Sequence, residues 1–152
     1  MQKVQRFYSA DRKVFVTGQT VLDASRYIAG QLEGLSTFED AGTQFVSVVG
    51  RMPKQDSSRA LTAMAEQQRR LDKKQGQPVT ESVGQMASAF AAGRLKQVLG
   101  GEKLDSTRAG ECLAKLLVHT PGGIEILGFM AVAQSRSERS KGPDLPGTKR
   151  VV

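Results

Sequence analysis

The chain is poor in the residues that build disulfides and metal sites. Of its 152 residues, one is cysteine and one is histidine, while tryptophan and asparagine are absent. The single Cys112 cannot form an internal bridge, which excludes the disulfide-built secreted domains. The single His119 excludes a site held by several histidines. We therefore expect no metal and no cofactor.

Catalytic motifs are also missing. No glycine-rich loop ends in Gly-Lys-Ser/Thr, and no three-glycine dinucleotide motif follows a predicted strand. The one available nucleophile–base pair, Cys112 with His119, lies on one face of a predicted helix, with its members about two turns, or roughly 10 Å, apart. Because a thiolate needs its base within hydrogen-bond distance, this helix would keep the two apart. We expect a protein that is not an enzyme, with Cys112 in its core.

Membrane and export signals are not evident. The residues after Met1 are polar and charged, where a signal peptide would be apolar. The longest apolar run, residues 124–133, is about half the length of a membrane-spanning helix. We expect a soluble protein without a membrane partner, in the cytoplasm or within a nucleoprotein particle.

Positive charge is the most informative bulk property. Twenty-two Lys and Arg residues face fifteen Asp and Glu residues, which leaves a net charge of +7 and an isoelectric point near 9.9. Such a field attracts polyanions, of which nucleic acid is the commonest. Many basic proteins use their charge only for solubility, so this property alone is a weak guide.

Residues 4–17 have the pattern of a β-hairpin. Two runs rich in β-branched and aromatic residues, 4–8 and 13–17, flank the turn-like segment 9–12. Because two strands alone are only marginally stable in water, we expect the ribbon to pack on helices. An edge left open could accept a strand from a partner.

The rest of the chain is predicted to be helical up to residue 134. Thr20 can cap the first helix, and Ser36-Thr37-Phe38-Glu39 has the pattern of a capping box that opens the second. Pro53 ends that second helix, and Thr120-Pro121 resembles the start of a last helix. The short apolar run 124–133 favours a buried helix, although a buried strand has the same pattern. No segment repeats convincingly. The expected helices cover about residues 20–35, 38–52, 57–74, 80–99, 106–117 and 121–133.

These features predict a mainly α protein of the α+β type. A compact bundle of about five to six helices with an N-terminal hairpin would form one domain over residues 1–134. Residues 135–152 hold five basic and two acidic residues and little apolar surface before the last two positions. We expect this segment to be a flexible, disordered basic tail.

Two groups of basic residues are candidates for contacts with phosphates. One lies on the polar face of helix 57–74 and the other in the tail. On the hairpin, Phe7, Tyr8 and Phe15 could stack on bases beside Arg6, Arg12 and Lys13, although packing against the helices is the expected role of the aromatic side chains. The predicted nucleic-acid-binding residues are Arg59, Arg69, Arg70, Lys73, Lys74, Arg136, Arg139, Lys141, Lys149 and Arg150.

The leading hypothesis is a non-enzymatic nucleic-acid-associated or assembly protein, of the accessory type found in viruses, plasmids or ribonucleoproteins. It would bind RNA or DNA without sequence preference, through the helix face and the tail. The alternative is a structural or protein-interaction subunit of a homo-oligomer or larger complex, without nucleic-acid contact. Small residues along helix 80–99 and the open hairpin edge favour that alternative.

Overall fold

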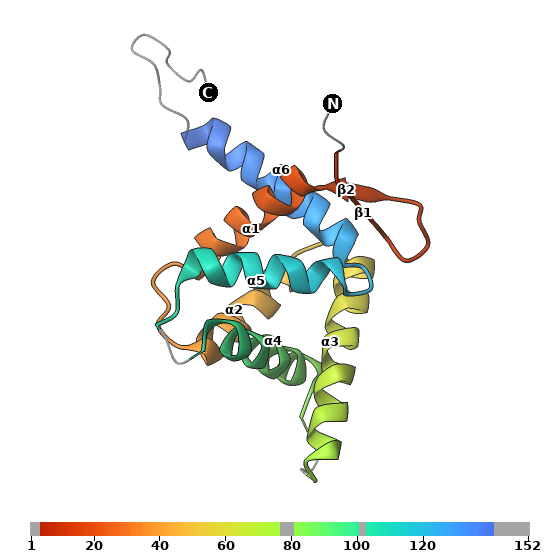
Figure 1. The fold of residues 1–152 in the computed structure, drawn as a ribbon, viewed down its shortest axis with the longest axis vertical. Helices are drawn as coiled ribbons and strands as arrows, with labels where there is room; N and C mark the ends of the chain where they lie inside the picture. Colours follow the sequence, from red (N-terminus) through yellow and green to blue (C-terminus); the bar gives the residue numbers. More distant parts are fainter. Residues whose placement is uncertain (1–3, 77–80, 101–102, 142–152) are drawn as a thin grey trace.

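The computed structural model describes residues 4–76, 81–100 and 103–141. This part of the chain is mainly helical with an N-terminal hairpin, which confirms the predicted fold class, and none of its helices is long and apolar enough to cross a membrane. Figure 1 shows α3 and α6 projecting from opposite ends of the molecule. The elements are β1 (Arg6–Tyr8), β2 (Phe15–Thr17), α1 (Gly18–Leu32), α2 (Phe38–Gly50), α3 (Lys54–Lys74), α4 (Val83–Leu99), α5 (Ser106–Val118) and α6 (Gly123–Lys141).

Several boundaries differ from the prediction for reasons of capping. Thr17, not Thr20, caps α1, because its side chain accepts a hydrogen bond from the amide of Thr20. The helix α6 begins at Gly123, after a turn in which Gly122 has a φ of 77°, a conformation that favours glycine. The apolar run 124–133 is helical, as favoured, and α6 continues through residues 135–141, which were predicted as tail. The remaining tail lies outside the described residues.

The structure reveals an internal repeat, which corrects the expectation that there is none. Ala24–Leu32 in α1 and Ala87–Leu95 in α4 share the pattern Ala-Ser-x-aromatic-x-Ala-Gly-x-Leu. The pair Ala41-Gly42 in α2 matches Ala109-Gly110 in α5, and a proline follows each pair after the same interval. Helices α1–α3, the first half, are therefore repeated as α4–α6, the second half.

The two halves are joined by an exchange of their first helices. Helix α1 packs mainly on α5 and α6, and α4 packs mainly on α2 and α3. At the closest approach, a Cβ on Gly42 would stand 2.4 Å from the carbonyl oxygen of Ser88, and a Cβ on Gly110 would stand 2.3 Å from that of Ser25. The contact of α1 with α5 therefore matches the contact of α4 with α2. This arrangement relates the two halves of the chain by an approximate two-fold axis.

Matching side-chain contacts within α3 and within α6 indicate that these two helices are also equivalent. The amide of Gln68 donates to Asp72 in α3, and the amide of Gln134 donates to Glu138 in α6, both at 2.8 Å. Met64 and Met130 are buried at equivalent positions, one turn before these glutamines. The repeat was missed in the sequence because the interval between equivalent residues changes from one helix pair to the next, so no constant period exists.

Candidate nucleic-acid interface

The outer face of the hairpin presents two aromatic rings, each beside an arginine. The side chains of Tyr8 and Phe15 are opposite each other in the antiparallel register, with ring centroids 5.5 Å apart. The guanidinium carbon of Arg6 lies 5.1 Å from the centre of the Phe15 ring, and that of Arg12 lies 5.5 Å from the centre of the Tyr8 ring. Tyr8 is 43% and Phe15 48% exposed. We call these four residues the hairpin platform.

The alternation of a β-strand explains why these rings face outward. Phe7 and Val16 form the neighbouring pair of the register and point to the opposite face, where they pack on the core. Val16 faces Gly128 of α6, and both α1 and α6 contact β2. The core side of the ribbon thus holds it on the helices, while the platform faces away from them.

The turn of the hairpin is fixed by Asp11. Its carboxylate accepts hydrogen bonds from the hydroxyl of Ser9 at 2.7 Å and from the backbone amide of Lys13 at 3.1 Å. The bond from Ser9, followed by that from Lys13, lowers the pKa of Asp11. Arg12, next to it, has a φ of 59°. This turn therefore carries the arginine that lies beside Tyr8.

The predicted basic residues of α3 do not form one group. Its last turns expose Arg69, Arg70, Lys73 and Lys74. The helix dipole favours positive charge at this end of a helix. Arg59 lies more than two turns earlier, with its Nη1 atom 3.7 Å from the Oε2 atom of Glu125 in α6. Arg59 is therefore engaged within the fold, away from the four basic residues at the helix end.

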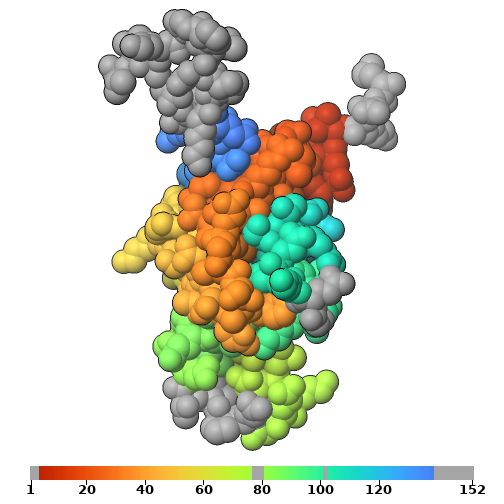
Figure 2. Space-filling view, turned by 90° about the vertical axis from the view of Figure 1, so that its left-hand side faces the viewer, coloured from red at the N-terminus to blue at the C-terminus, as the bar shows by residue number. Residues whose placement is uncertain are grey.

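The predicted tail residues lie far from those of α3. Arg136 is exposed on α6, and Arg139 and Lys141 follow it in the same helix. In the space-filling view, α6 and the hairpin lie at one end of the molecule and the end of α3 lies at the other (Figure 2). By the repeat, Arg136 is the equivalent of Arg70, so the two basic helix ends are related by the two-fold arrangement. Lys149 and Arg150 lie outside the described residues.

The hairpin platform is not among the residues predicted to bind nucleic acid. Its aromatic side chains were expected to be buried against the helices, and the structure buries only part of that set: Phe7 packs on the core, while Tyr8 and Phe15 do not. The signal was present in the alternation, because Phe7 and Tyr8 are adjacent and must point to opposite faces of a strand.

Cys112 is buried between α4 and α5, with its sulfur 4.0 Å from the carbonyl oxygen of Arg94. Burial raises the pKa of the thiol, although the nearby charges of Arg94 and Lys115 act in the opposite direction. A raised pKa keeps the sulfur in its less reactive thiol form. Within the described residues, no three metal-ligating side chains come together.

A comparison of the chain with models of known protein families, with curated proteins and with solved structures finds no match.

Proposed function

We propose that this protein binds single-stranded nucleic acid without sequence preference, through the hairpin platform. The observation that supports this most is the pair of outward-facing rings of Tyr8 and Phe15, each with a guanidinium beside it. Every base has a flat face that stacks on an aromatic side chain, and this contact contributes about 1–3 kcal/mol per base. Arginine adds a contact to phosphate that does not depend on sequence.

The basic helix ends extend the surface beyond the hairpin. Figure 2 shows α6, the helix that carries Arg136, at the same end of the molecule as the hairpin, so a strand bound on the platform could continue along this helix. The end of α3 offers a second cationic site at the opposite end of the molecule. A protein with two such ends can hold two segments of a strand, or two strands, as expected for an assembly factor rather than an enzyme.

The test is a fluorescence anisotropy titration with labelled single-stranded RNA, single-stranded DNA and duplex DNA at low and high salt. The Tyr8→Leu/Phe15→Leu double variant keeps apolar side chains on the hairpin but removes the stacking faces. We expect its affinity for single strands to fall by about tenfold or more, with little change for the duplex.

Phe129→Leu is the matched control, because Phe129 is 46% exposed on α6 and lies outside the platform. Its affinity should equal that of the wild type. Wild-type protein that binds no nucleic acid at low salt, or double-variant protein that binds single strands as tightly as the wild type, would refute the proposal.

A second candidate function is that of a self-associating structural subunit. Phe129 and Val132 lie one turn apart on α6 and are 46% and 50% exposed, which leaves apolar surface on that helix face. If this face joins two copies of the chain, light scattering should give twice the monomer mass. Phe129→Ser/Val132→Ser protein should then be monomeric, and a wild-type monomer at high concentration would exclude this role.

A further inference from the structure

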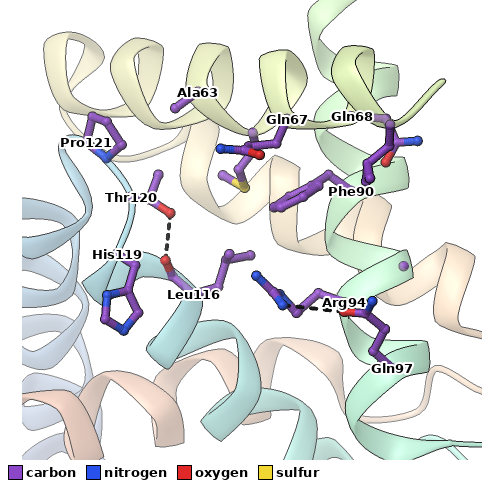
Figure 3. Close-up of a pocket in the computed structure, with 13 residues that line it drawn as sticks. Ala63, Gln67, Gln68, Phe90, Arg94, Gln97, Leu116, His119, Thr120 and Pro121 are labelled. Atoms are coloured by element: carbon purple, nitrogen blue, oxygen red, sulfur yellow. Dashed lines mark hydrogen bonds between the residues drawn. The ribbon is translucent and has the colours of Figure 1, made fainter. Parts of the chain in front are cut away.

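A cavity of about 460 Å³ lies between α3, α4 and the end of α5. Figure 3 shows Phe90 and Arg94 reaching into it from α4, below Gln67 and Gln68 of α3, with Leu116 and His119 on the opposite side. We call it the Phe90 cavity. Its volume falls within the range of roughly 300–1,000 Å³ that is typical of small-molecule sites.

The walls of the Phe90 cavity combine an aromatic face, amides and basic side chains. Among the described residues that line it, none has a carboxylate, whereas Arg94 and His119 are basic and Gln67, Gln68 and Gln97 supply amides. The guanidinium of Arg94 lies 5.9 Å from the centre of the Phe90 ring and donates to Gln97 at 3.4 Å. An aromatic ring beside a guanidinium suits a ligand that has both a flat ring and an anionic group.

The basic character continues into a groove between α4 and α5. Arg94, Leu116 and His119 also line this groove, where Arg108 and Lys115 join them with one carboxylate, that of Glu111. The exposed Val98 and the buried Cys112 form part of its apolar surface. Arg94 and His119 therefore lie where the Phe90 cavity meets this groove. Arg108 and Lys115 line the groove beyond them.

The repeat provides an internal comparison for this cavity. A second cavity, of about 780 Å³, is lined by Tyr27, Gly30, Gln31, Gln134 and Ser137, the repeat equivalents of five residues of the Phe90 cavity. Its lining includes three glutamates and a single arginine, Arg26. The same scaffold thus forms an acidic cavity in one place and a basic cavity in the other. Packing alone does not require the arginine of the Phe90 cavity, because the first half has Gln31 at the position of Arg94.

The clearest difference lies at one pair of equivalent positions. In the first half, Arg51 donates a hydrogen bond to Gln31 at 2.9 Å, which joins the end of α2 to α1. In the second half, these positions hold His119 and Arg94. Arginine has no acceptor atom, so Arg94 cannot act as the hydrogen-bond acceptor that Gln31 is in the first half. An anion beside Arg94 would supply an acceptor for its guanidinium.

We propose that the Phe90 cavity binds an aromatic organic phosphate of the nucleoside monophosphate class. The base lies against Phe90 with its edge towards the glutamines, and the phosphate lies beside Arg94, within reach of the basic groove that contains Lys115. The proposal does not rest on nucleic-acid binding by the hairpin platform. Because an end nucleotide of a strand has the same chemistry as a free nucleotide, the experiment must separate these two sources.

The test is isothermal titration calorimetry of the full chain with four nucleoside 5′-monophosphates, adenosine, ribose 5-phosphate and a 5′-phosphorylated oligonucleotide. Arg94→Gln/Lys115→Ser introduces the residues that the first half has at the equivalent positions, Gln31 and Ser47, so the fold should tolerate it. We expect at least one monophosphate to bind the wild type, and the double variant to bind it about tenfold or more weakly. Adenosine and ribose 5-phosphate, each lacking one of the two groups, should bind more weakly than the monophosphate.

Two controls separate this site from the hairpin platform. Arg26→Gln removes an exposed arginine from the acidic cavity and should leave nucleotide binding unchanged. The Tyr8→Leu/Phe15→Leu variant should also bind the monophosphate normally, even if it has lost single-strand binding. If only the oligonucleotide binds, and Arg94→Gln/Lys115→Ser weakens it while removal of its 5′-phosphate does the same, a strand end is the source. Wild-type protein that binds neither ligand class, or binds equally well after the double substitution, would overturn the proposal.

Discussion

Gly42 and Gly110 make the same helix contact in the two halves of the molecule, whereas the residues around the ends of those contacting helices differ in charge. Each glycine lies against a serine carbonyl and the alanine one turn later in the partner helix. On the surface, Asp40 and Ser47 of α2 have Arg108 and Lys115 as their equivalents in α5. The contacts that hold the helices together are thus shared, and the side chains available to a ligand are not.

This difference separates what the fold requires from what a function would require. A buried contact that both halves make is needed for packing, because in both halves the helices approach too closely for a larger residue. A charge present in one half alone is not needed for that geometry. Substitutions that exchange equivalent residues between the halves can therefore test a surface without disturbing the fold.

The largest effect should follow substitution of the two contact glycines. In Gly110→Ala the new methyl group would stand 2.3 Å from the backbone oxygen of Ser25, and Gly42→Ala would meet Ser88 in the same way. Since neither backbone can yield without separating the helices, we expect each variant to lose about 3 kcal/mol of unfolding free energy. Urea denaturation followed by circular dichroism measures this loss.

Gly30→Ala provides the matched control within α1. No described atom outside its own helix lies within 4 Å of the position that the new methyl group would take. This variant should gain up to about 1 kcal/mol, since alanine is the better helix former. A clear difference in cost between Gly42→Ala and Gly110→Ala would break the comparison, because it would mean that the two helix contacts are not equivalent.

A smaller and equal effect is expected at the equivalent N-caps of α2 and α5. The hydroxyl of Thr37 accepts from the amide of Asp40 at 3.0 Å, and the carboxylate of Asp105 accepts from the amide of Thr107 at 2.9 Å. Thr37→Ala and Asp105→Ala should each cost about 1 kcal/mol in the same denaturation experiment. Thr37→Ser and Asp105→Ser, which keep a cap, should recover most of the stability. No loss in either alanine variant would show that the cap bond does not stabilise its helix.

Local structure in this chain was largely predictable because it depends on nearby residues. The helix starts near Thr37 and Asp105 and the helix stop at Pro53 were evident in the sequence, although the capping-box pattern placed the first cap at Ser36 and the structure places it at Thr37. The cap of α1 was misplaced by one turn, because Thr17 and Thr20 can both serve and only the adjoining strand decides between them. The end of α6 was placed too early because polar residues alone do not end a helix.

The arrangement of the helices was not predictable in the same way. The packing of α1 on α5 and of α4 on α2 depends on contacts between residues far apart in the chain. The connections between the repeated helices differ in length, so equivalent positions do not recur at one interval. The Phe90 cavity likewise joins three helices through residues that are unremarkable in isolation. Arg94 and His119 differ from their equivalents Gln31 and Arg51, and this difference can be recognised only once the fold shows which positions are equivalent.

The smallest expected effect concerns an ion pair that is present in only one half. The ammonium group of Lys96 in α4 contacts the carboxylate of Glu39 in α2, and this hydrogen bond lowers the pKa of Glu39. At the equivalent positions the chain has Glu33 and Thr107, which cannot form such a pair. The contact between α2 and α4 should therefore depend on the charge of a glutamate, whereas the equivalent contact between α5 and α1 should not.

A double-mutant cycle of Glu39→Gln and Lys96→Met, measured by urea denaturation at several pH values, tests this asymmetry. Because the folded state lowers the pKa of Glu39, the pair stabilises the protein above the ordinary pKa of a glutamate. That contribution is lost as the pH falls from this value through the lowered one. The coupling should be small at neutral pH, since both side chains are exposed, and it should weaken with salt. Coupling that persists in acid would mean that packing, rather than charge, joins the two helices at this point.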